Sequence, residues 1–526
     1  MFTGCGSDKG SSSAKSTSAA SAANDTVDED GKVNGIMYQE GLPLVDEGAY
    51  TFSIFCDDSS ESGEFIMLDE FKKQTNVDVD LKIYPYETAT ERLNLDLNSG
   101  DYADVIGGWT LSDNAILTYG VNQGVFIPLE DYFEKYCPNI SAILDLPGVR
   151  EKMTAPDGHI YTIPYVCADS TVGYSPYINT KWLENVGMSM PTTTDEFEAV
   201  LKAFKEQDAN GNGDASDEIP FSTDPNNKHI EAMAGYFGLP MNKLGIAIQN
   251  EKVVYGGVSD TYREFLSWFH KLYAEGLVDV ELYTQDSSTW EGKGNQDLYG
   301  VSIAYGSGEF TGIPAAEERG DFDSMPVLNT DKDGIWLRDT EGFSVYRTQA
   351  VITNKAEHPE IICRWFDNAF ALENGIGCNR GPVGVIVNKE DDGYHAIDTT
   401  TLSEEDQEKY SWGNLWPQSL PKYLPADFEF VEEHPMYDEK KATEEAYEAN
   451  LTKEIIPSYW IDLDKIDTFS DTNTAIKDFF EQQQAQFVCG ELDIDNDADW
   501  QAYVDGMYSL GLEDWVATQG IEEIAK

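Results

Sequence analysis

The segment Val77-Asp-Val-Asp-Leu-Lys-Ile83 alternates apolar and charged residues with a period of two, which predicts a half-buried β-strand. Working outward, apolar residues at helical spacing predict a helix over residues 65–74 and another over residues 88–98. Apolar runs at residues 51–55 and 104–109 predict two further strands. This strand-helix-strand-helix-strand order predicts an α/β domain with a mainly parallel sheet.

The chain is long enough for two to four domains or for two large lobes, since it has 526 residues. Helical spacing of apolar residues recurs at 197–204, 262–269 and 362–369, and core packing explains these stripes better than ligand contact does. Residues 385–445 are acidic and carry no clear period.

The charge balance excludes several classes of partner. The chain has 96 acidic and 35 basic side chains, a formal net charge of −61. Nucleic acid and anionic lipid headgroups are held mainly by Lys and Arg, so neither is an expected partner. Hydrophobic residues make up 41% and aromatic residues 12%, which is ample material for a folded core. No apolar run reaches the length of about 18 residues that a membrane-spanning helix needs.

Seven cysteines without a CxxC pair exclude a disulfide scaffold and a zinc site of the usual spacing, and six of them are expected to be buried thiols. Cys5 differs, because Met1-Phe-Thr-Gly-Cys5 precedes a polar Ser/Ala-rich stretch. This arrangement resembles the end of a bacterial lipoprotein signal, with residues 1–47 as signal remnant and flexible tether. The resemblance implies a lipid on Cys5 and a protein outside the cytoplasmic membrane, on its outer face or in a periplasm. An incidental cysteine in a tail is the alternative.

Five further segments follow one another along the chain. They are Leu97-Asn-Ser-Gly-Asp-Tyr-Ala-Asp-Val-Ile106, Gly124-Val-Phe-Ile-Pro-Leu-Glu-Asp-Tyr132, Asp157-Gly-His-Ile-Tyr-Thr-Ile-Pro-Tyr165, Ile178-Asn-Thr-Lys-Trp-Leu-Glu-Asn-Val-Gly187 with Pro191 to Phe197, and Leu492-Asp-Ile-Asp-Asn-Asp-Ala-Asp-Trp500 through Leu512. Together they resemble the extracellular solute-binding proteins of bacterial carbohydrate ABC importers. Ala103 stands where that family often has proline.

The resemblance implies a two-lobed periplasmic-binding-protein-like fold of type II, in which mixed or parallel sheets are flanked by helices and a hinge joins the lobes. It places the N-terminal lobe at residues 48–165 and about 340–400, and the C-terminal lobe at residues 166–339 and about 401–526. It also implies a monomer without enzymatic activity, which captures a sugar or oligosaccharide in an interlobe cleft and delivers it to an ABC transporter permease.

A candidate calcium loop runs from Asp208 to Phe221. Its first half matches the EF-hand pattern D-x-[DN]-x-[DN]-G, in which alternate oxygen ligands and a glycine turn suit calcium. The loop departs from the motif at position twelve, which is Ile219. Some larger members of the family carry a similar loop, and this resemblance implies a structural calcium ion with side-chain ligands and one backbone carbonyl, from Asp214. The side-chain ligands would be Asp208, Asn210, Asn212, Asp217 and Glu218. A polar Asn-Gly turn without metal is the alternative.

Candidate ligand residues are aromatic and polar, because sugars present apolar ring faces beside hydroxyl groups. Trp109 leaves an expected strand at its carboxyl end, where open α/β sheets place ligands. Tyr165 and Asp169 follow a segment that the resemblance places near the hinge, and Tyr305 lies in an expected strand-exit loop. The other candidates lie in expected turns or loops and are Trp336, Arg338, Trp412 and Trp416. Core packing is the alternative for each one taken singly.

Two rival functions remain open from the sequence. A secreted glycosidase needs paired carboxylates, but 96 acidic residues always offer pairs, and no G-x-S-x-G, H-E-x-x-H or P-loop motif is present. A binding protein for peptide or another small solute is the second rival. The acidic composition predicts a preference for neutral sugars over uronate chains, unless Arg338 or Arg380 enters the site.

Overall fold

The computed structural model describes residues 25–58, 63–225, 229–312, 320–431 and 435–525. Cys5 and residues 1–24 of the expected tether lie outside this description. Across the described segments, no helix is long and apolar enough to cross a bilayer.

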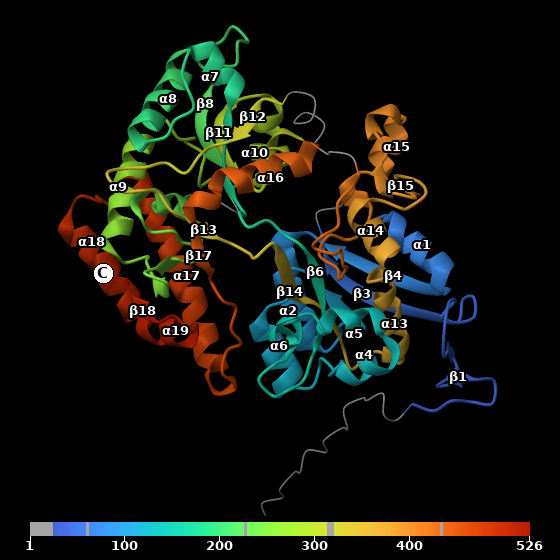
Figure 1. Ribbon diagram of the computed structural model, residues 1–526. Helices are drawn as coiled ribbons and strands as arrows, with labels where there is room; N and C mark the ends of the chain where they lie inside the picture. Colours follow the sequence, from blue (N-terminus) through green and yellow to red (C-terminus); the bar gives the residue numbers. More distant parts are fainter. Residues whose placement is uncertain (1–24, 59–62, 226–228, 313–319, 432–434, 526) are drawn as a thin grey trace, which may run out of the picture. The chain divides into compact units, whose positions relative to one another are not determined.

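The chain divides into two compact units (Figure 1). Unit 1 takes the described residues up to Gly63, then Leu68–Ile163 and Thr348–Asn368. Unit 2 takes Glu64–Met67, Pro164–Arg347 and the residues from Ala369 onward. Each unit is therefore discontinuous in sequence.

Unit 1 is built on a five-stranded sheet of order β4-β3-β5-β14-β6. β3 (Tyr50–Asp57) runs parallel to both β4 (Val77–Tyr84) and β5 (Val105–Gly107). β14 (Phe343–Ile352) is antiparallel to β5, and β6 (Thr162–Ala168) forms the edge. The first three strands are parallel because a helix connects each to the next.

These connecting helices confirm the predicted strand-helix order. α1 (Ile66–Thr75) joins β3 to β4, and α2 (Tyr86–Ser99) joins β4 to β5. Gly100 caps α2 with φ of 75°, as its type predicts. Unit 1 also contains β1 Lys32–Val33, β2 Met37–Tyr38, α3 Asp113–Ala115, α4 Glu130–Tyr136, α5 Pro138–Leu144, α6 Val149–Met153 and most of α13 Pro359–Ala369.

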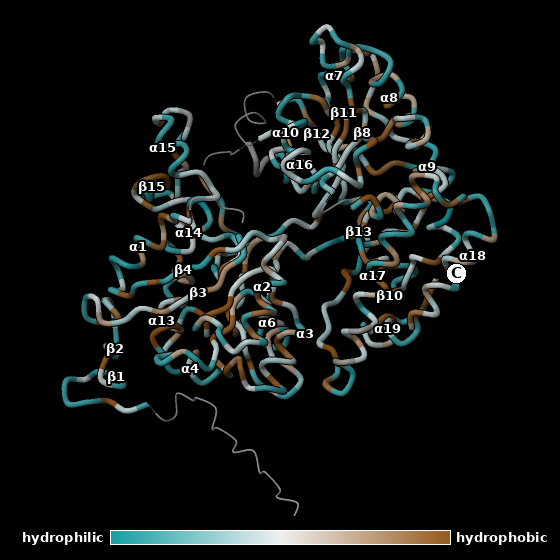
Figure 2. The backbone as a smooth tube through the Cα atoms, turned by 180° about the vertical axis from the view of Figure 1, so that it is seen from behind, coloured by the Kyte–Doolittle hydropathy of each residue, from teal (hydrophilic) through white to brown (hydrophobic). Residues whose placement is uncertain are grey.

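Aromatic side chains form much of the core beneath the sheet of unit 1. The ring of Trp365 on α13 meets the rings of Phe52 and Phe71 edge-on, at centroid distances of 5.3 and 5.5 Å. All three are buried. Figure 2 shows such hydrophobic stretches as brown segments beside β3, whereas exposed elements such as α15 (Glu404–Lys409) are teal.

Unit 2 contains a four-stranded sheet of order β12-β7-β11-β8. β8 (Ile219–Thr223) and β11 (Tyr299–Ala304) are parallel, so their carboxyl ends share one edge. β7 (Ser175–Asn179) is antiparallel to β11 and to β12 (Phe322–Ser324), so the residues just before β7 lie at that same edge. The core beside this sheet includes Tyr177, Trp290, Tyr299, Phe310 and Phe322.

Further helices and short strands complete unit 2. The strands are β9 Ile246–Gln249, β10 Lys252–Tyr255, β13 Trp336–Arg338, β15 Val387–Glu390, β16 Gly393–Ala396, β17 Leu451–Ile455 and β18 Glu523–Ile524. The helices are α7 Thr180–Val186, α8 Thr194–Glu206, α9 Asp260–Ala274, α10 Ser287–Asn295, α11 Gly308–Thr311, α14 Leu372–Arg380, α16 Pro435–Tyr447, α17 Ile466–Cys489, α18 Asp497–Ser509 and α19 Leu512–Thr518.

Two strands carry the chain from one unit to the other. The division falls between Ile163 and Pro164 within β6, and between Arg347 and Thr348 within β14. Residues 369–400, which the sequence-based division assigns to the first lobe, cluster with unit 2. α14 packs closely against the backbone of Tyr423, since a side chain at Gly375 would collide with the Tyr423 carbonyl. Tyr423 in turn pairs with Val166 of unit 2.

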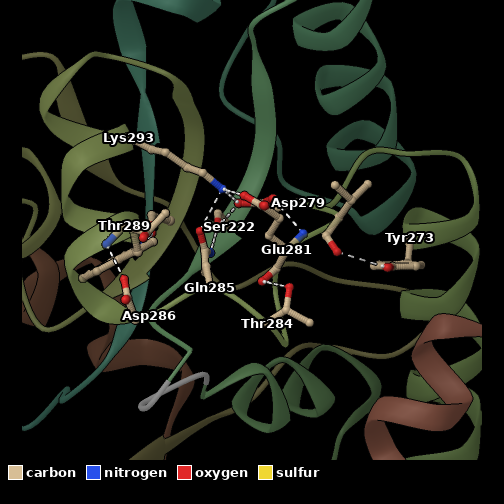
Figure 3. A network of polar contacts seen from close by, with 12 residues as sticks. Ser222, Tyr273, Asp279, Glu281, Thr284, Gln285, Asp286, Thr289 and Lys293 are labelled. Atoms are coloured by element: carbon tan, nitrogen blue, oxygen red, sulfur yellow. Dashed lines mark hydrogen bonds and ion pairs between the residues drawn. The ribbon is translucent and has the colours of Figure 1, made fainter.

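A partly buried ion-pair network holds the carboxyl-terminal part of β8 in unit 2 (Figure 3). The ammonium of Lys293 on α10 donates to Asp279 Oδ2 at 3.0 Å, Glu281 Oε2 at 2.8 Å and Gln285 Oε1 at 2.8 Å. Ser222 on β8 donates to Asp279 Oδ2 at 3.1 Å. Since Asp279 is buried, the Lys293 ammonium supplies the charge that makes its burial tolerable.

We expect Lys293→Met to lower the free energy of unfolding by about 3 kcal/mol, because it leaves the Asp279 carboxylate buried without its cation. Lys252→Met is the matched control, since Lys252 pairs at 3.4 Å with Glu523 on the exposed surface and its loss should cost within about 0.5 kcal/mol. Denaturant unfolding measures both, and equal losses in the two variants would contradict the role given to Lys293.

Candidate functional site

The candidate site lies at the edge of the unit 2 sheet where β8 and β11 end. Tyr305 follows β11 directly, Asp224 follows β8, and Gly173-Tyr174 precedes β7. Open α/β sheets place ligands at the carboxyl ends of their strands.

Three rings stand together at this edge. Tyr174 meets Tyr305 edge-on with centroids 6.2 Å apart, and it stacks on His229 at 4.1 Å with planes 9° apart. All three are partly exposed. Burial lowers the pKa of His229 to about 4, so its imidazole is neutral at neutral pH. Neutral, partly exposed ring faces suit the apolar face of a sugar.

Asp169 joins this ring group to the strands that cross between the units. Its carboxylate accepts from Tyr305 Oη at 3.0 Å and from Tyr346 Oη at 2.7 Å. Tyr346 lies on β14 and stacks on Tyr165 of β6, with centroids 5.6 Å apart. Burial raises the pKa of both Tyr305 and Tyr346, so both phenols stay protonated and donate. The structure thus brings three predicted residues, Tyr165, Asp169 and Tyr305, into one network through Tyr346.

Helix α16 supports the same edge with charged side chains. Lys440 Nζ donates to the carbonyls of Gly173 and Tyr305, each at 2.6 Å, and lies 3.9 Å from the centroid of the Tyr305 ring. Burial lowers the pKa of Lys440 to about 8. Glu439 accepts from the N–H of Ser307 at 2.8 Å. These bonds fix the backbone on which the Tyr305 ring is carried.

Two more carboxylates hold the loop that leads into β7. Glu444 Oε1 accepts from the N–H of Thr171 at 2.8 Å, and Asp339 Oδ2 accepts from the N–H of Gly173 at 2.6 Å. A side chain at Gly173 would meet Asp339 Oδ2 at 2.6 Å, so only glycine allows this approach. The site is therefore rigid and rich in carboxylates.

Other predicted ligand residues have different surroundings. Trp336 is 1% exposed and packs against Tyr236 and Tyr447 in the core of unit 2. Trp416 is 0% exposed. Both side chains are therefore buried in the structure, and their role as ligand contacts stays a prediction. Arg338 donates to the carbonyl of Thr452 at 3.1 Å and to Glu448, so its guanidinium serves packing within unit 2.

Trp412 remains available, with 51% of its surface exposed. The ammonium of Lys422 lies 4.9 Å from the centroid of Tyr165 and 5.9 Å from that of Trp412, which connects Trp412 to the ring network of Tyr165 and Tyr346. In unit 1, Trp109 is 45% exposed after β5. Its N–H and that of Thr110 donate to the buried Asp57, at 2.9 and 2.6 Å.

Gly108 allows this exit from β5. It has φ of 138°, and any side chain there would collide with the Asp57 carboxylate. Glycine is therefore required for Asp57 to reach the two N–H groups that orient Trp109.

The predicted metal loop forms a tight turn between α8 and β8. Asp208 Oδ2 accepts from the N–H of Gly213 at 3.0 Å, and Asn210 Oδ1 accepts from the N–H of Asn212 at 3.0 Å. Gly213 has φ of 96°, which glycine adopts readily. The first ligand positions are thus gathered around one loop.

The loop also holds oxygen atoms without a donor. Asp208 Oδ1 and Glu218 Oε2 are buried and accept no hydrogen bond from the described residues. Asp217 accepts from the side-chain amide of Asn212 at 2.7 Å, and burial raises the pKa of Glu218. Carboxylate oxygens buried without donors fit a hard cation such as Ca²⁺.

The comparisons with known proteins agree with this architecture. Residues 59–375 match the family model "Bacterial extracellular solute-binding protein". The chain is 32% identical over 379 residues to the fructooligosaccharide ABC transporter substrate-binding protein FusA of Streptococcus pneumoniae, covering 70% of this chain and 68% of FusA. It is 28% identical over 280 residues to Lipoprotein LipO of Bacillus subtilis, covering 51% of this chain and 52% of LipO.

Solved structures give the same result. FusA of S. pneumoniae in complex with kestose has a TM-score of 0.77 at 26% identity and covers 89% of this chain and 98% of its own. An EF-hand mutant of FusA in complex with fructo-nystose has a TM-score of 0.76 with the same coverage. The chain belongs to the bacterial extracellular solute-binding proteins, and the predicted two-lobed α/β fold is confirmed.

Sequence reasoning missed Tyr174, His229, Tyr346 and Lys440. Tyr174 carries a usable signal, because it directly precedes a strand that pairs with β11. Tyr346 and Lys440 form hydrogen bonds with site residues that lie more than a hundred positions away in the sequence. No local sequence pattern predicts such contacts.

The low pKa of His229 predicts a pH dependence of stability. The unfolded chain binds a proton on this imidazole near pH 6.5, but the folded chain does so only near pH 4. Between pH 6.5 and pH 4 the unfolded chain therefore binds more protons at this site than the folded chain does. The free energy of unfolding is unaffected by His229 above pH 6.5, and it falls as the pH is lowered toward 4, by at most about 1.4 kcal/mol per pH unit. Denaturant unfolding from pH 4 to 7 should show a shallower slope for His229→Gln than for the unmodified chain. Identical slopes would contradict the burial of this imidazole.

Proposed function

We propose that this protein captures a neutral oligosaccharide and hands it, uncleaved, to the permease of an ABC importer. The observation that carries the proposal is the group of Tyr174, Tyr305 and His229 beside the Asp169 carboxylate, at the ligand edge of the unit 2 sheet. Ring faces beside fixed hydrogen-bond acceptors are the surface that a sugar requires. Relatedness to FusA, whose name describes a fructooligosaccharide-binding protein, supports the same class of ligand.

The charges at the site favour a ligand without carboxylates. Asp169 accepts a hydrogen bond from Tyr305, and Glu439 and Glu444 accept from the nearby loop residues Ser307 and Ser170, so these loops carry several negative charges. The nearby ammonium of Lys440 already donates to two backbone carbonyls. A uronate chain would bring further negative charge to this surface, and like charges at close range repel. Fructooligosaccharides are neutral and fit the site better.

We assign the chain no catalytic step. The carboxylates at the site accept hydrogen bonds from backbone N–H groups and from serine and tyrosine hydroxyls, which stabilises loops and rings. Release of reducing sugar during incubation would instead favour the rival glycosidase.

The loop from Asp208 to Glu218 is proposed to hold a structural calcium ion. Asp208, Asn210, Asn212, Asp217 and Glu218 would supply side-chain oxygens, and Asp214 its backbone carbonyl. The buried oxygens of Asp208 and Glu218 support this assignment, as does the EF-hand in the FusA relative. A bound cation would fix the connection between α8 and β8, the strand whose carboxyl end borders the ligand site.

Cys5 is proposed to carry a lipid that anchors the protein to the outer side of the cytoplasmic membrane. The protein is proposed to act as a monomer. The polar stretch after Cys5 and the similarity to Lipoprotein LipO support this anchoring. The polar residues after Cys5 would form the tether between this lipid and the body of the protein.

We expect kestose to raise the melting temperature and oligogalacturonate to leave it unchanged, because only the neutral ligand avoids repulsion by the site carboxylates.

Tyr305→Ala should raise the Kd for kestose, measured by calorimetry, about ten-fold or more, which corresponds to a loss of about 1.4 kcal/mol in binding free energy. Tyr508→Ala is the matched control, since Tyr508 is exposed on α18 in the same unit. Stabilisation by short peptides and by no glycan would contradict the proposal.

We expect calcium to raise the melting temperature of chelator-stripped protein. At a calcium concentration about 100-fold above Kd, the gain is about 2.7 kcal/mol. Asp208→Ala should abolish the response, whereas Asp495→Ala should keep it, because the acidic cluster around Asp495 lacks the glycine turn of a metal loop. Equal melting temperatures with and without calcium would contradict the proposed calcium site.

A further inference from the structure

The hairpin of β15 and β16 in unit 2 carries a group of metal-ligating side chains away from the candidate sugar site. Glu390 ends β15, Asp392 lies in the turn, and His395 lies on β16. One carboxylate oxygen of each acid and one ring nitrogen of His395 all lie within 4.8 Å of one another. In the part of the chain that the structure describes, no other three His, Cys, Asp or Glu side chains gather this closely.

The strand register explains why these side chains gather. Asn388 pairs with His395, and Glu390 pairs with Gly393. Side chains alternate between the faces of a hairpin, and residues directly opposite each other share a face. Glu390 and His395 are therefore diagonal neighbours on one face. Asp392 is in the two-residue turn between the strands, and its Oδ1 lies 3.0 Å from Nε2 of His395.

The opposite face of the hairpin carries Lys389. Its ammonium pairs with Glu373 on α14 at 2.8 Å and lies 5.7 Å from the centroid of the Tyr394 ring. Lys389 and Tyr394 are opposed in the register, so their contact agrees with the assignment of faces. The hairpin thus separates the charge of Lys389 from the carboxylates of Glu390 and Asp392, and a cation beside them does not meet this lysine.

The backbone that carries the group is held on both sides. The carbonyl of Tyr394 accepts from the N–H of Val431 at 3.0 Å, and the carbonyl of Ile386 accepts from the N–H of Ile397 at 3.0 Å. The side chain of His395 is only 16% exposed, which restricts its ring. Ligands on a fixed backbone lose little freedom when they bind an ion, so this hairpin suits a metal site.

The spacing fits a small cation. In a tetrahedral zinc site, bonds of about 2.1 Å place neighbouring ligand atoms about 3.4 Å apart. The pair of His395 and Asp392 is already closer than this, at 3.0 Å. Glu390 is exposed, so its side chain can rotate to bring its oxygen to the same ion.

We infer that Glu390, Asp392 and His395 bind a divalent transition-metal ion of the zinc type, with water completing its coordination. One imidazole and two carboxylates suit Zn²⁺, and the two carboxylates balance its charge. Ca²⁺ takes oxygen ligands, six to eight of them, so this site differs in chemistry from the loop at Asp208. The ion would fasten the turn to β16 and so stabilise the hairpin, whether or not the protein binds a sugar.

Calorimetry with zinc chloride tests the site. The full-length chain is stripped with a chelator, its accessible thiols are alkylated because thiolates also bind zinc, and millimolar calcium is kept present throughout. We expect zinc to bind at one site despite the calcium and to raise the melting temperature. Absence of zinc heat, or loss of zinc binding as calcium is added, would overturn the inference.

Variants assign the heat to the hairpin. His395→Gln should raise the Kd for zinc at least about ten-fold, because it removes the nitrogen ligand. His159→Gln is the matched control and should keep the Kd, since His159 also pairs with a carboxylate, that of Glu130 at 2.5 Å, but belongs to no such group of three. An unchanged Kd in His395→Gln would overturn the inference.

A second variant covers a failure of His395→Gln to fold. Asp392→Asn changes one oxygen ligand in an exposed turn and keeps its shape. It should melt like the unmodified chain without zinc and gain less stability when zinc is added. An equal gain with zinc in Asp392→Asn and in the unmodified chain would assign the zinc to another site and contradict the inference.

Discussion

The hydrogen bonds that Asp169 accepts from Tyr305 and Tyr346 are the interaction on which the candidate site depends. One carboxylate orients two rings that come from strands far apart in sequence. Tyr305 follows β11 of the unit 2 sheet, and Tyr346 lies on β14, a strand that crosses between the units. Because the pKa of each phenol is raised by burial, both remain donors, and the rings are held in place at neutral pH. The loop carbonyls, Lys440 and Tyr174 are arranged around this fixed point.

Some of the acidic side chains of the chain have a structural use. Asp57, Asp339 and Glu444 each accept a backbone N–H in a loop at the end of a strand. Such a loop cannot satisfy its N–H groups in a sheet, and a carboxylate supplies the acceptor that it needs. The composition alone suggests that most of the 96 acidic residues form a solvated surface. The structure adds a second role, in which carboxylates hold the loops that present Trp109 and Tyr305.

Local patterns in the sequence were sufficient for part of the fold and part of the site. The alternation at residues 77–83 and the helical spacing over residues 65–74 predicted the first strands and helices of unit 1, because each pattern depends on neighbours in the chain. The burial of Trp336 and Trp416 could not be predicted from the sequence, since the burial of a tryptophan in a loop-like segment depends on distant packing partners. Tyr346 was missed for the same reason. Its role follows from a hydrogen bond to a residue 177 positions away.

A crystal structure of the protein with kestose would show where the sugar binds. We predict a fructosyl ring against Tyr305 or Tyr174 and sugar hydroxyls within hydrogen-bonding distance of the carboxylates beside them. Kestose bound elsewhere, with the Asp169 network and its rings free of sugar, would show that this edge of the unit 2 sheet is not the ligand site.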